Sequence, residues 1–149
     1  MLSKILIMST LSKILVILII SLIPSPLKFN SIYIYQEKTL EQSIEDGQWV
    51  YEDFCVRCHL PSGTGVSGVY PPLAKSNWLN DKIEESIASL KYGLEGEIEV
   101  NGETYNNVMQ SQGLSDEEIA DVMNYIMNSW GNTQKKMITT KQVKAVKKK

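Results

Sequence analysis

Apolar residues recur at helical spacing in three stretches of the chain. In the first stretch, from near Leu40 to Cys55, acidic residues fill the positions between the apolar ones. Residues three or four apart share one face of a helix, so the pattern predicts an amphipathic helix with one buried face. Glycine inside a helix costs about 1 kcal/mol relative to alanine, and Gly47 lies on the apolar face, which suggests that another helix crosses there. This face consists of Leu40, Ile44, Gly47, Tyr51 and Phe54.

The second stretch predicts a helix that begins at Asn80 or Asp81, since either residue can cap a helix start. Gly93 and Gly96 follow the last apolar turn and are expected to end the helix. Its apolar face consists of Ile83, Ile87, Leu90 and Leu94.

A hairpin and a third helix are predicted in the remainder of the folded part. Alternating apolar and acidic residues precede Asn101-Gly102, which is a strong signal for a tight hairpin turn, so we expect a short two-stranded excursion before Tyr105. Ser115 and Glu118 form the sequence signature of a capping box at the start of the last helix. The apolar stripe of that helix consists of Ile119, Val122, Met123, Ile126, Met127 and Trp130.

Charge divides the chain into three parts. The 149 residues include 15 Lys and Arg against 17 Asp and Glu, which gives a formal net charge of −2. Residues 1–36 carry +3, residues 37–134 carry −12 and residues 135–149 carry +7. Only about a hundred residues remain for a folded body, which excludes a multidomain enzyme. The acidic body argues against a nucleic-acid partner, because phosphate binding requires clustered Lys and Arg.

The N-terminal residues have the pattern of a targeting segment. Residues 14–23 are apolar except for Ser21 and end at Pro24. This run is shorter than the about 20 residues that span a bilayer and suits the apolar region of a signal peptide. Because no small-x-small cleavage site follows, an uncleaved N-terminal membrane anchor stays open as the alternative interpretation of this segment. We assign residues 1–31 to a signal peptide or N-terminal membrane anchor and residues 32–39 to a linker, which predicts a periplasmic or other extracytoplasmic location.

The C-terminal residues differ in composition from the folded body, which we assign to residues 40–132. Residues 133–149 are rich in lysine and contain few apolar side chains. This composition is typical of a solvated, disordered tail, which is what we expect here. The alternative is attraction of the tail to anionic lipid or to an acidic partner.

The two cysteines and the one histidine of the chain all fall in Cys55-Val56-Arg57-Cys58-His59. A structural zinc site needs a second pair of ligands, which is missing, and a thioredoxin-like dithiol follows a strand rather than a helix. A disulfide between the two cysteines would close a very small loop and leave His59 unexplained. Covalent attachment of haem uses all three residues, because Cys55 and Cys58 form thioethers and His59 binds the iron. The motif therefore predicts one haem c.

An ordered series of residues surrounds this motif. It comprises Gly47, Tyr51, Gly63, Gly65, Tyr70-Pro71-Pro72-Leu73-Ala74, Asn77-Trp78-Leu79, Gly93-Leu94, Gly96, Val100-Asn101-Gly102, Tyr105-Asn106, Met109, residues 114–120 and residues 129–132. With this series the chain resembles class I c-type cytochromes from about Leu40 to Asn132. It is similar to the single-haem domains of bacterial respiratory cytochromes. It is also similar to the single-haem domains that are fused or paired with periplasmic dehydrogenases and copper nitrite reductases. The resemblance implies an all-α class I cytochrome c fold, in which three to four short helices wrap around one covalently bound haem. It also implies that Tyr125, or else Trp130, packs on Gly47.

The resemblance adds further residues to the haem pocket, namely Pro71, Leu73, Trp78 and Tyr105. A histidine that binds a metal normally donates its other ring N–H to a backbone carbonyl or a carboxylate. The family's pattern points to the Pro71 carbonyl as the acceptor for His59 and places Leu73 against the porphyrin. A plain rigid turn is the alternative explanation of the two prolines.

The sixth iron ligand is expected to be a methionine, because the motif uses the only histidine and both thiols. Met123 and Met127 lie on the apolar stripe of the last helix, where core packing is the more common role. Met137 lies in the lysine-rich segment. Met109 lies in a polar loop just before the last helix, which is the position of the family's ligand loop, although Gln110 follows it where many relatives have proline. We expect Met109 to be the distal ligand.

Ligation by His59 and Met109 implies a function. Both axial positions would be filled by protein, so no substrate could bind the metal without displacing a ligand. The expected activity is one-electron transfer by a carrier rather than an enzyme, from a dehydrogenase or quinol-oxidising complex to a terminal oxidase or reductase. Two alternatives stay open: a haem subunit of a larger oxidoreductase complex, or a five-coordinate sensor or peroxidase-like protein if Met109 is not a ligand. Membrane association is expected, if at all, through the N-terminal segment or the lysine-rich tail.

Overall fold

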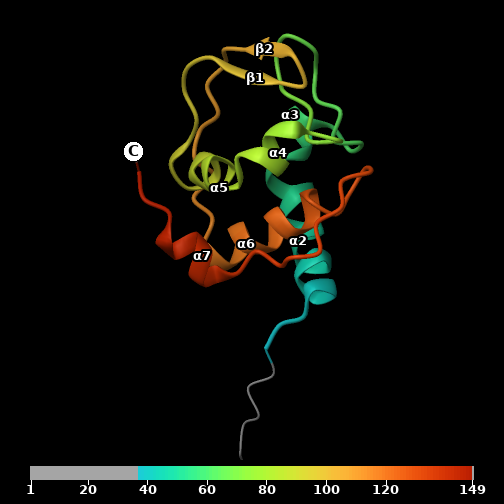
Figure 1. Cartoon of the computed structure of the whole chain (residues 1–149), viewed down its shortest axis with the longest axis vertical. Helices are drawn as coiled ribbons and strands as arrows, with labels where there is room; N and C mark the ends of the chain where they lie inside the picture. The colour runs from blue at the N-terminus through green and yellow to red at the C-terminus, as the bar shows by residue number, and fades with distance from the viewer. Residues whose placement is uncertain (1–36, 149) are drawn as a thin grey trace, which may run out of the picture. The chain divides into compact units, whose positions relative to one another are not determined.

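A computed structural model of the chain describes residues 37–148, so the predicted signal peptide or anchor and residues 32–36 of the predicted linker lie outside the described residues. No helix of residues 37–148 is long and apolar enough to span a bilayer. The described part contains six helices and one antiparallel two-stranded sheet (Figure 1). These elements are α2 (Leu40–Phe54), α3 (Val56–His59), α4 (Asn77–Asp81), α5 (Ile83–Tyr92), β1 (Ile98–Val100), β2 (Glu103–Tyr105), α6 (Asp116–Ile126) and α7 (Thr140–Ala145).

Helices α2 and α6 form the centre of the core, and each begins at a capping box. At α2, Thr39 Oγ1 accepts from the Gln42 N–H at 3.2 Å, and Gln42 Oε1 accepts from the Thr39 N–H at 2.9 Å. At α6, Ser115 and Glu118 make the same reciprocal pair, as predicted. The apolar stripe predicted for α6 is buried as well, at Ile119, Val122, Met123, Ile126 and Met127.

The two helices cross at Gly47, which confirms the prediction of a crossing there. A Cβ atom on Gly47 would overlap the backbone carbonyl of Asp121 and would lie 2.9 Å from Cβ of Tyr125. Tyr125 is therefore the aromatic residue at the crossing. Trp130, the second candidate, lies against Gly63 instead.

The helix predicted to begin at Asn80 or Asp81 begins instead at Ile83, as α5, and the two residues expected to cap it are the last residues of a separate helix, α4. Lys82 lies between the two helices and has non-helical backbone angles, with φ at −132° and ψ at 54°. Leu79 on α4 and Ile87 on α5 are both buried on either side of this break. Lysine is an ordinary helix former, so helical spacing gave no indication of the break. This division, the single turn α3 and the unexpected α7 explain why the described residues form more helices than the three to four expected.

The predicted hairpin is present. Strands β1 and β2 pair antiparallel, with Ile98 opposite Tyr105 and Val100 opposite Glu103. Asn101, at the turn, also exchanges hydrogen bonds with α4: the Asn77 N–H donates to Asn101 Oδ1 at 3.0 Å and the Asn101 N–H donates to Asn77 Oδ1 at 2.8 Å. The hairpin is thereby attached to the helical body.

The lysine-rich segment is ordered, so the prediction of a disordered tail at residues 133–149 is wrong for its described part. Val143 of α7 is 0% exposed and Ile138 is 2% exposed, and both belong to the core. The Asn124 side chain binds both backbone groups of Ile138, donating to its carbonyl at 2.9 Å and accepting from its N–H at 2.7 Å. Lys91 Nζ donates to the Val143 carbonyl at 2.9 Å. Composition could not predict this packing, because a few well-spaced apolar residues reach the core while the described lysines of the segment stay exposed.

Candidate cofactor-binding site

Three of the predicted site residues come from the junction of α2 and α3. The backbone carbonyl of Cys55 accepts from the N–H groups of Cys58 and His59, at 3.1 and 3.0 Å. One helical turn therefore holds the two thiols and the imidazole, and all three side chains line one cavity. Both cysteines are free thiols. Burial raises the pKa of the Cys55 thiol to about 12, and the neighbouring Cys58 adds to the shift.

His59 is held in one tautomer by the proline segment. Its Nδ1 lies 3.0 Å from the Pro71 carbonyl oxygen. Because a carbonyl can only accept, Nδ1 carries the proton and Nε2 keeps a free lone pair. Burial lowers the pKa of His59 below its ordinary value, and the hydrogen bond to Pro71 offsets part of that shift. The imidazole is therefore neutral at physiological pH, which is the form that binds metals.

Met109 is positioned by a backbone pair with the end of the α5 region. The Leu94 N–H donates to the Met109 carbonyl at 2.8 Å, and the Met109 N–H donates to the Leu94 carbonyl at 2.9 Å. Gly93 permits this approach, since it has φ of +84° and a Cβ atom on it would lie 2.8 Å from the Met109 carbonyl oxygen. The loop before α6 thus brings the Met109 side chain to the same cavity as His59.

The remaining wall of the cavity is largely apolar. Leu73 and Trp78 line it, as do residues that the sequence analysis had not assigned to the pocket: Leu79, Leu90, Ile98, Val100, Val122, Met123 and Ile126. Helical periodicity had already identified several of these as inward-facing, which was the available signal. Met123 is a second methionine at the wall and is fully buried in the core.

Tyr105 is the one predicted pocket residue that does not line this cavity. It lines a small adjoining cavity that Pro71 and Met109 also border. The Tyr105 ring is buried, and its hydroxyl donates to Glu103 at 2.6 Å. Burial and this carboxylate together raise the pKa of Tyr105 to about 12.

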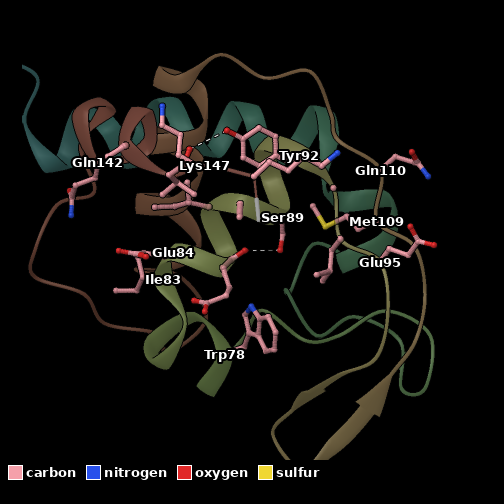
Figure 2. A pocket seen from close by; sticks show the side chains of 18 of the residues that line it. Trp78, Ile83, Glu84, Ser89, Tyr92, Glu95, Met109, Gln110, Gln142 and Lys147 are labelled. Carbon is pink, nitrogen blue, oxygen red and sulfur yellow. Dashed lines mark hydrogen bonds between the residues drawn. The ribbon is translucent and has the colours of Figure 1, made fainter.

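A second, open groove of about 860 Å³ lies outside α5 (Figure 2). Its sides come from α5, from the loop at Met109 and Gln110, and from the C-terminal segment. The Tyr92 hydroxyl donates to the Val146 carbonyl at 3.1 Å, so α5 and the C-terminal segment are bonded along this groove. Trp78 and Met109 line both the groove and the inner cavity and therefore belong to the wall between them.

The donor set of the inner cavity fits a covalently attached haem. Two thiols lie one helical turn apart, a neutral imidazole presents Nε2, and a thioether comes from another loop. Nowhere in residues 37–148 do three or more Cys, His, Asp or Glu side chains gather as they would to hold a bare metal ion. An apolar wall with an imidazole and a thioether at one cavity is compatible with haem, whose iron can take one nitrogen and one thioether ligand.

Comparison with known proteins agrees with this chemistry. The family model described as "Cytochrome c" matches residues 44–130. The chain is 41% identical over 111 residues to cytochrome c-552 of Thermus thermophilus, and this match covers 68% of this chain and 84% of that protein. It is 33% identical over 89 residues to the cytochrome c subunit of a quinone alcohol dehydrogenase of Gluconobacter oxydans, covering 58% of this chain and 18% of that subunit. It is 30% identical over 107 residues to the gluconate 2-dehydrogenase cytochrome c subunit of Pantoea cypripedii, and this match covers 70% of this chain and 24% of that subunit.

Proposed function

The chain belongs to the cytochrome c family, and from this premise we propose that it is an exported monohaem carrier of single electrons. Its fold is that of class I cytochromes c, and its cofactor is one covalently attached haem c. The proposal is that it receives electrons from a dehydrogenase or a quinol-oxidising complex and passes them to a terminal oxidase or reductase. The export part of the proposal rests on the apolar N-terminal sequence.

The observation that carries the proposal is the convergence of four donor side chains on one cavity. We infer that Cys55 and Cys58 hold the cofactor through thioethers, that Nε2 of His59 is the proximal ligand and that Met109 is the distal ligand. When bound, the haem supplies a reversible one-electron Fe(III)/Fe(II) couple. Pro71 keeps the imidazole in the metal-binding tautomer, and the apolar wall excludes water.

Two protein ligands suit a carrier better than an enzyme. With His59 and Met109 both in place, no open axial position is left for a substrate, and a thioether ligand raises the reduction potential. Residues 37–148, which include six lysines of the packed C-terminal segment, carry a net charge of −6. This acidic charge favours docking on a basic surface of a redox partner, with association that slows as the salt concentration rises.

Covalent attachment is tested with the thiols. The wild-type protein, produced with the machinery that attaches haem c, should keep its haem through acid-acetone extraction, and Cys55→Ser/Cys58→Ser should not. A double variant that still carries haem after extraction would refute the assignment of the thiols. In the ferric wild type, the weak far-red absorption band of thioether ligation should be present, and its absence would contradict Met109 as a ligand.

A second candidate function is that of a haem subunit within a larger oxidoreductase. The names of several relatives favour it, since they are cytochrome subunits of dehydrogenases, although the chain spans about a fifth of the length of those subunits. Native electrophoresis of soluble and membrane fractions with haem staining separates the two functions. A free carrier migrates alone, whereas a subunit migrates with its complex.

A further inference from the structure

We propose that Asn132 is a positioning residue that tunes the reduction potential by fixing the carbonyl to which His59 donates. The inference rests on the proposed function, because it takes His59 as an iron ligand. Asn132 lies in the turn after α6, well separated in sequence from His59, and its side chain does not line the cavity.

The segment that carries the acceptor carbonyl has few backbone donors of its own. Pro71 and Pro72 have no N–H group, so neither is held by a donated backbone hydrogen bond. The segment is anchored on both sides of them. Before the prolines, the backbone N–H and carbonyl of Tyr70 pair with those of Val66, both at 2.8 Å, and beyond them the N–H groups of Leu73 and Ala74 both donate to the Gly63 carbonyl, at 2.7 and 2.8 Å. Because the proline rings also fix φ at both positions, a displacement of Leu73 is passed on to the Pro71 carbonyl.

Asn132 supplies a second anchor at Leu73. Its Nδ2 donates to the carbonyls of Leu73 and Ile126, both at 2.7 Å, so both amide protons are used. The partners fix the orientation of the amide, since a flipped amide would place Oδ1 against two carbonyl oxygens. Asn132 is 7% exposed, and its Oδ1 has no hydrogen-bond partner among the described residues. Its hydrogen bonding is therefore directed entirely at these two carbonyls, which join the end of α6 to the proline segment.

The same turn also holds the beginning of the loop that leads to the proline segment. Trp130 Nε1 donates to the Pro61 carbonyl at 3.1 Å. Gly63 has φ of +64°, and a Cβ atom on it would overlap the Trp130 ring. The turn after α6 thus contacts the loop near His59 through Trp130 and near Pro71 through Asn132.

The hydrogen bond between His59 and Pro71 connects this anchor to the electronic properties of the ligand. A carbonyl that accepts from the second ring nitrogen raises the basicity of a metal-bound imidazole. A more basic ligand favours the more highly charged Fe(III) and so lowers the reduction potential. Without Asn132, we expect the 3.0 Å contact between Nδ1 and the Pro71 oxygen to weaken. The reduction potential should then rise.

The test uses the haem-containing protein and a matched control. Asn132→Leu removes both donors at similar volume, and Asn132→Ser leaves one hydroxyl donor. Asn128→Leu is the control, because Asn128 lies one turn earlier. Its side chain donates to the Asn124 carbonyl at 2.8 Å and accepts from the Gln134 N–H at 3.2 Å, so neither bond reaches the proline segment.

At a fixed applied potential, the ratio of Fe(II) to Fe(III) in Asn132→Leu should be at least about twofold higher than in the wild type. At 59 mV per tenfold change, this ratio corresponds to a reduction potential raised by about 18 mV. Asn132→Ser should show a smaller rise and Asn128→Leu none. Solvent exchange of the His59 Nδ1 proton, measured by NMR in the reduced protein, should be faster in both Asn132 variants. If Asn132→Leu does not accumulate with haem, Asn132→Ser decides by the same two measurements.

Potentials equal to the wild-type value in the Asn132 variants, whatever their melting temperatures, would overturn the inference and leave Asn132 a structural residue. A wild-type protein that lacks a reversible one-electron couple would refute the proposed function instead. The two failures are therefore distinguishable.

Discussion

Replacement of Gly47 by alanine separates two opposite expectations for the crossing of α2 and α6. Helix propensity alone predicts that the variant is more stable by about 1 kcal/mol. In the structure, however, the new Cβ would overlap the Asp121 carbonyl and lie 2.9 Å from Cβ of Tyr125. Neither atom is at the end of a flexible side chain, so relief of the overlap requires α6 to move away from α2.

The cost of that movement exceeds the gain in propensity. Overpacking of a core site costs about 1 to 3 kcal/mol or more, and the upper part of this range applies because the obstacle is backbone. Moving α6 would also weaken the buried hydrogen bond from Ser43 Oγ to Asp121 Oδ1, which is 2.6 Å long. After subtraction of the propensity gain, we expect Gly47→Ala to lose about 2 kcal/mol of unfolding free energy.

Thermal and denaturant unfolding of the haem-containing protein measure this loss. For a domain of this size, about 4 °C or more of melting temperature corresponds to 1 kcal/mol, so the melting temperature of Gly47→Ala should fall by about 8 °C or more. Glu45→Ala, on the exposed face of α2, is the control and should stay within about 0.5 kcal/mol of the wild type. A Gly47→Ala variant as stable as the wild type would refute the tight crossing.

Three further predictions concern other parts of the molecule. Met109→Ala should abolish the far-red band of the ferric protein and lower its reduction potential, since a thioether ligand raises that potential; an unchanged spectrum would exclude Met109 as a ligand. Val143→Ala removes apolar volume from a site that is 0% exposed and should lower the free energy of unfolding by about 1 to 2 kcal/mol. Lys144→Ala, at an exposed position, is the control and should leave it almost unchanged. Equal losses in the two variants would contradict a packed C-terminal segment. Backbone and side-chain hydrogen bonds with Ser115 lower the pKa of Glu118, so this cap stabilises the fold above the ordinary glutamate pKa and loses its effect as the pH falls through the lowered value. Glu118→Gln should therefore flatten the acid side of the stability–pH curve, and an identical acid side in the variant would count against this contribution.

The elements that could be predicted from the sequence are those that depend on neighbouring residues. Asn101 and Gly102 have φ of 53° and 81°, which is the left-handed backbone that a two-residue hairpin turn needs. Because Asn and Gly adopt this backbone readily, the two residue types predicted the turn. The capping boxes are equally local. Thr139 and Gln142 form such a box at the start of α7, so that helix had a local signal as well, although the burial of Val143 depends on distant contacts. The local pattern held no signal for the break at Lys82.

The candidate site divides in the same way. The cysteines and His59 are neighbours in sequence, so their spacing alone indicated their chemistry. Asn132 belongs to the series that carries the resemblance, but its role was not predicted, because Leu73, which it anchors, is 59 positions away. Periodicity also identified Met123 as inward-facing, but it could not tell whether the neighbour of an inward-facing side chain is protein or cofactor.

A spectroelectrochemical titration of the purified haem-containing protein, carried out with and without carbon monoxide, tests the central claim most directly. If His59 and Met109 occupy both axial positions and the chain is an electron carrier, the titration should show one reversible one-electron transition. The reduced protein should then give the same spectrum with and without carbon monoxide. A carbon monoxide adduct of the reduced protein would mean an open axial position, and the lack of a reversible transition would mean that the chain is not an electron carrier. Either result would contradict the account.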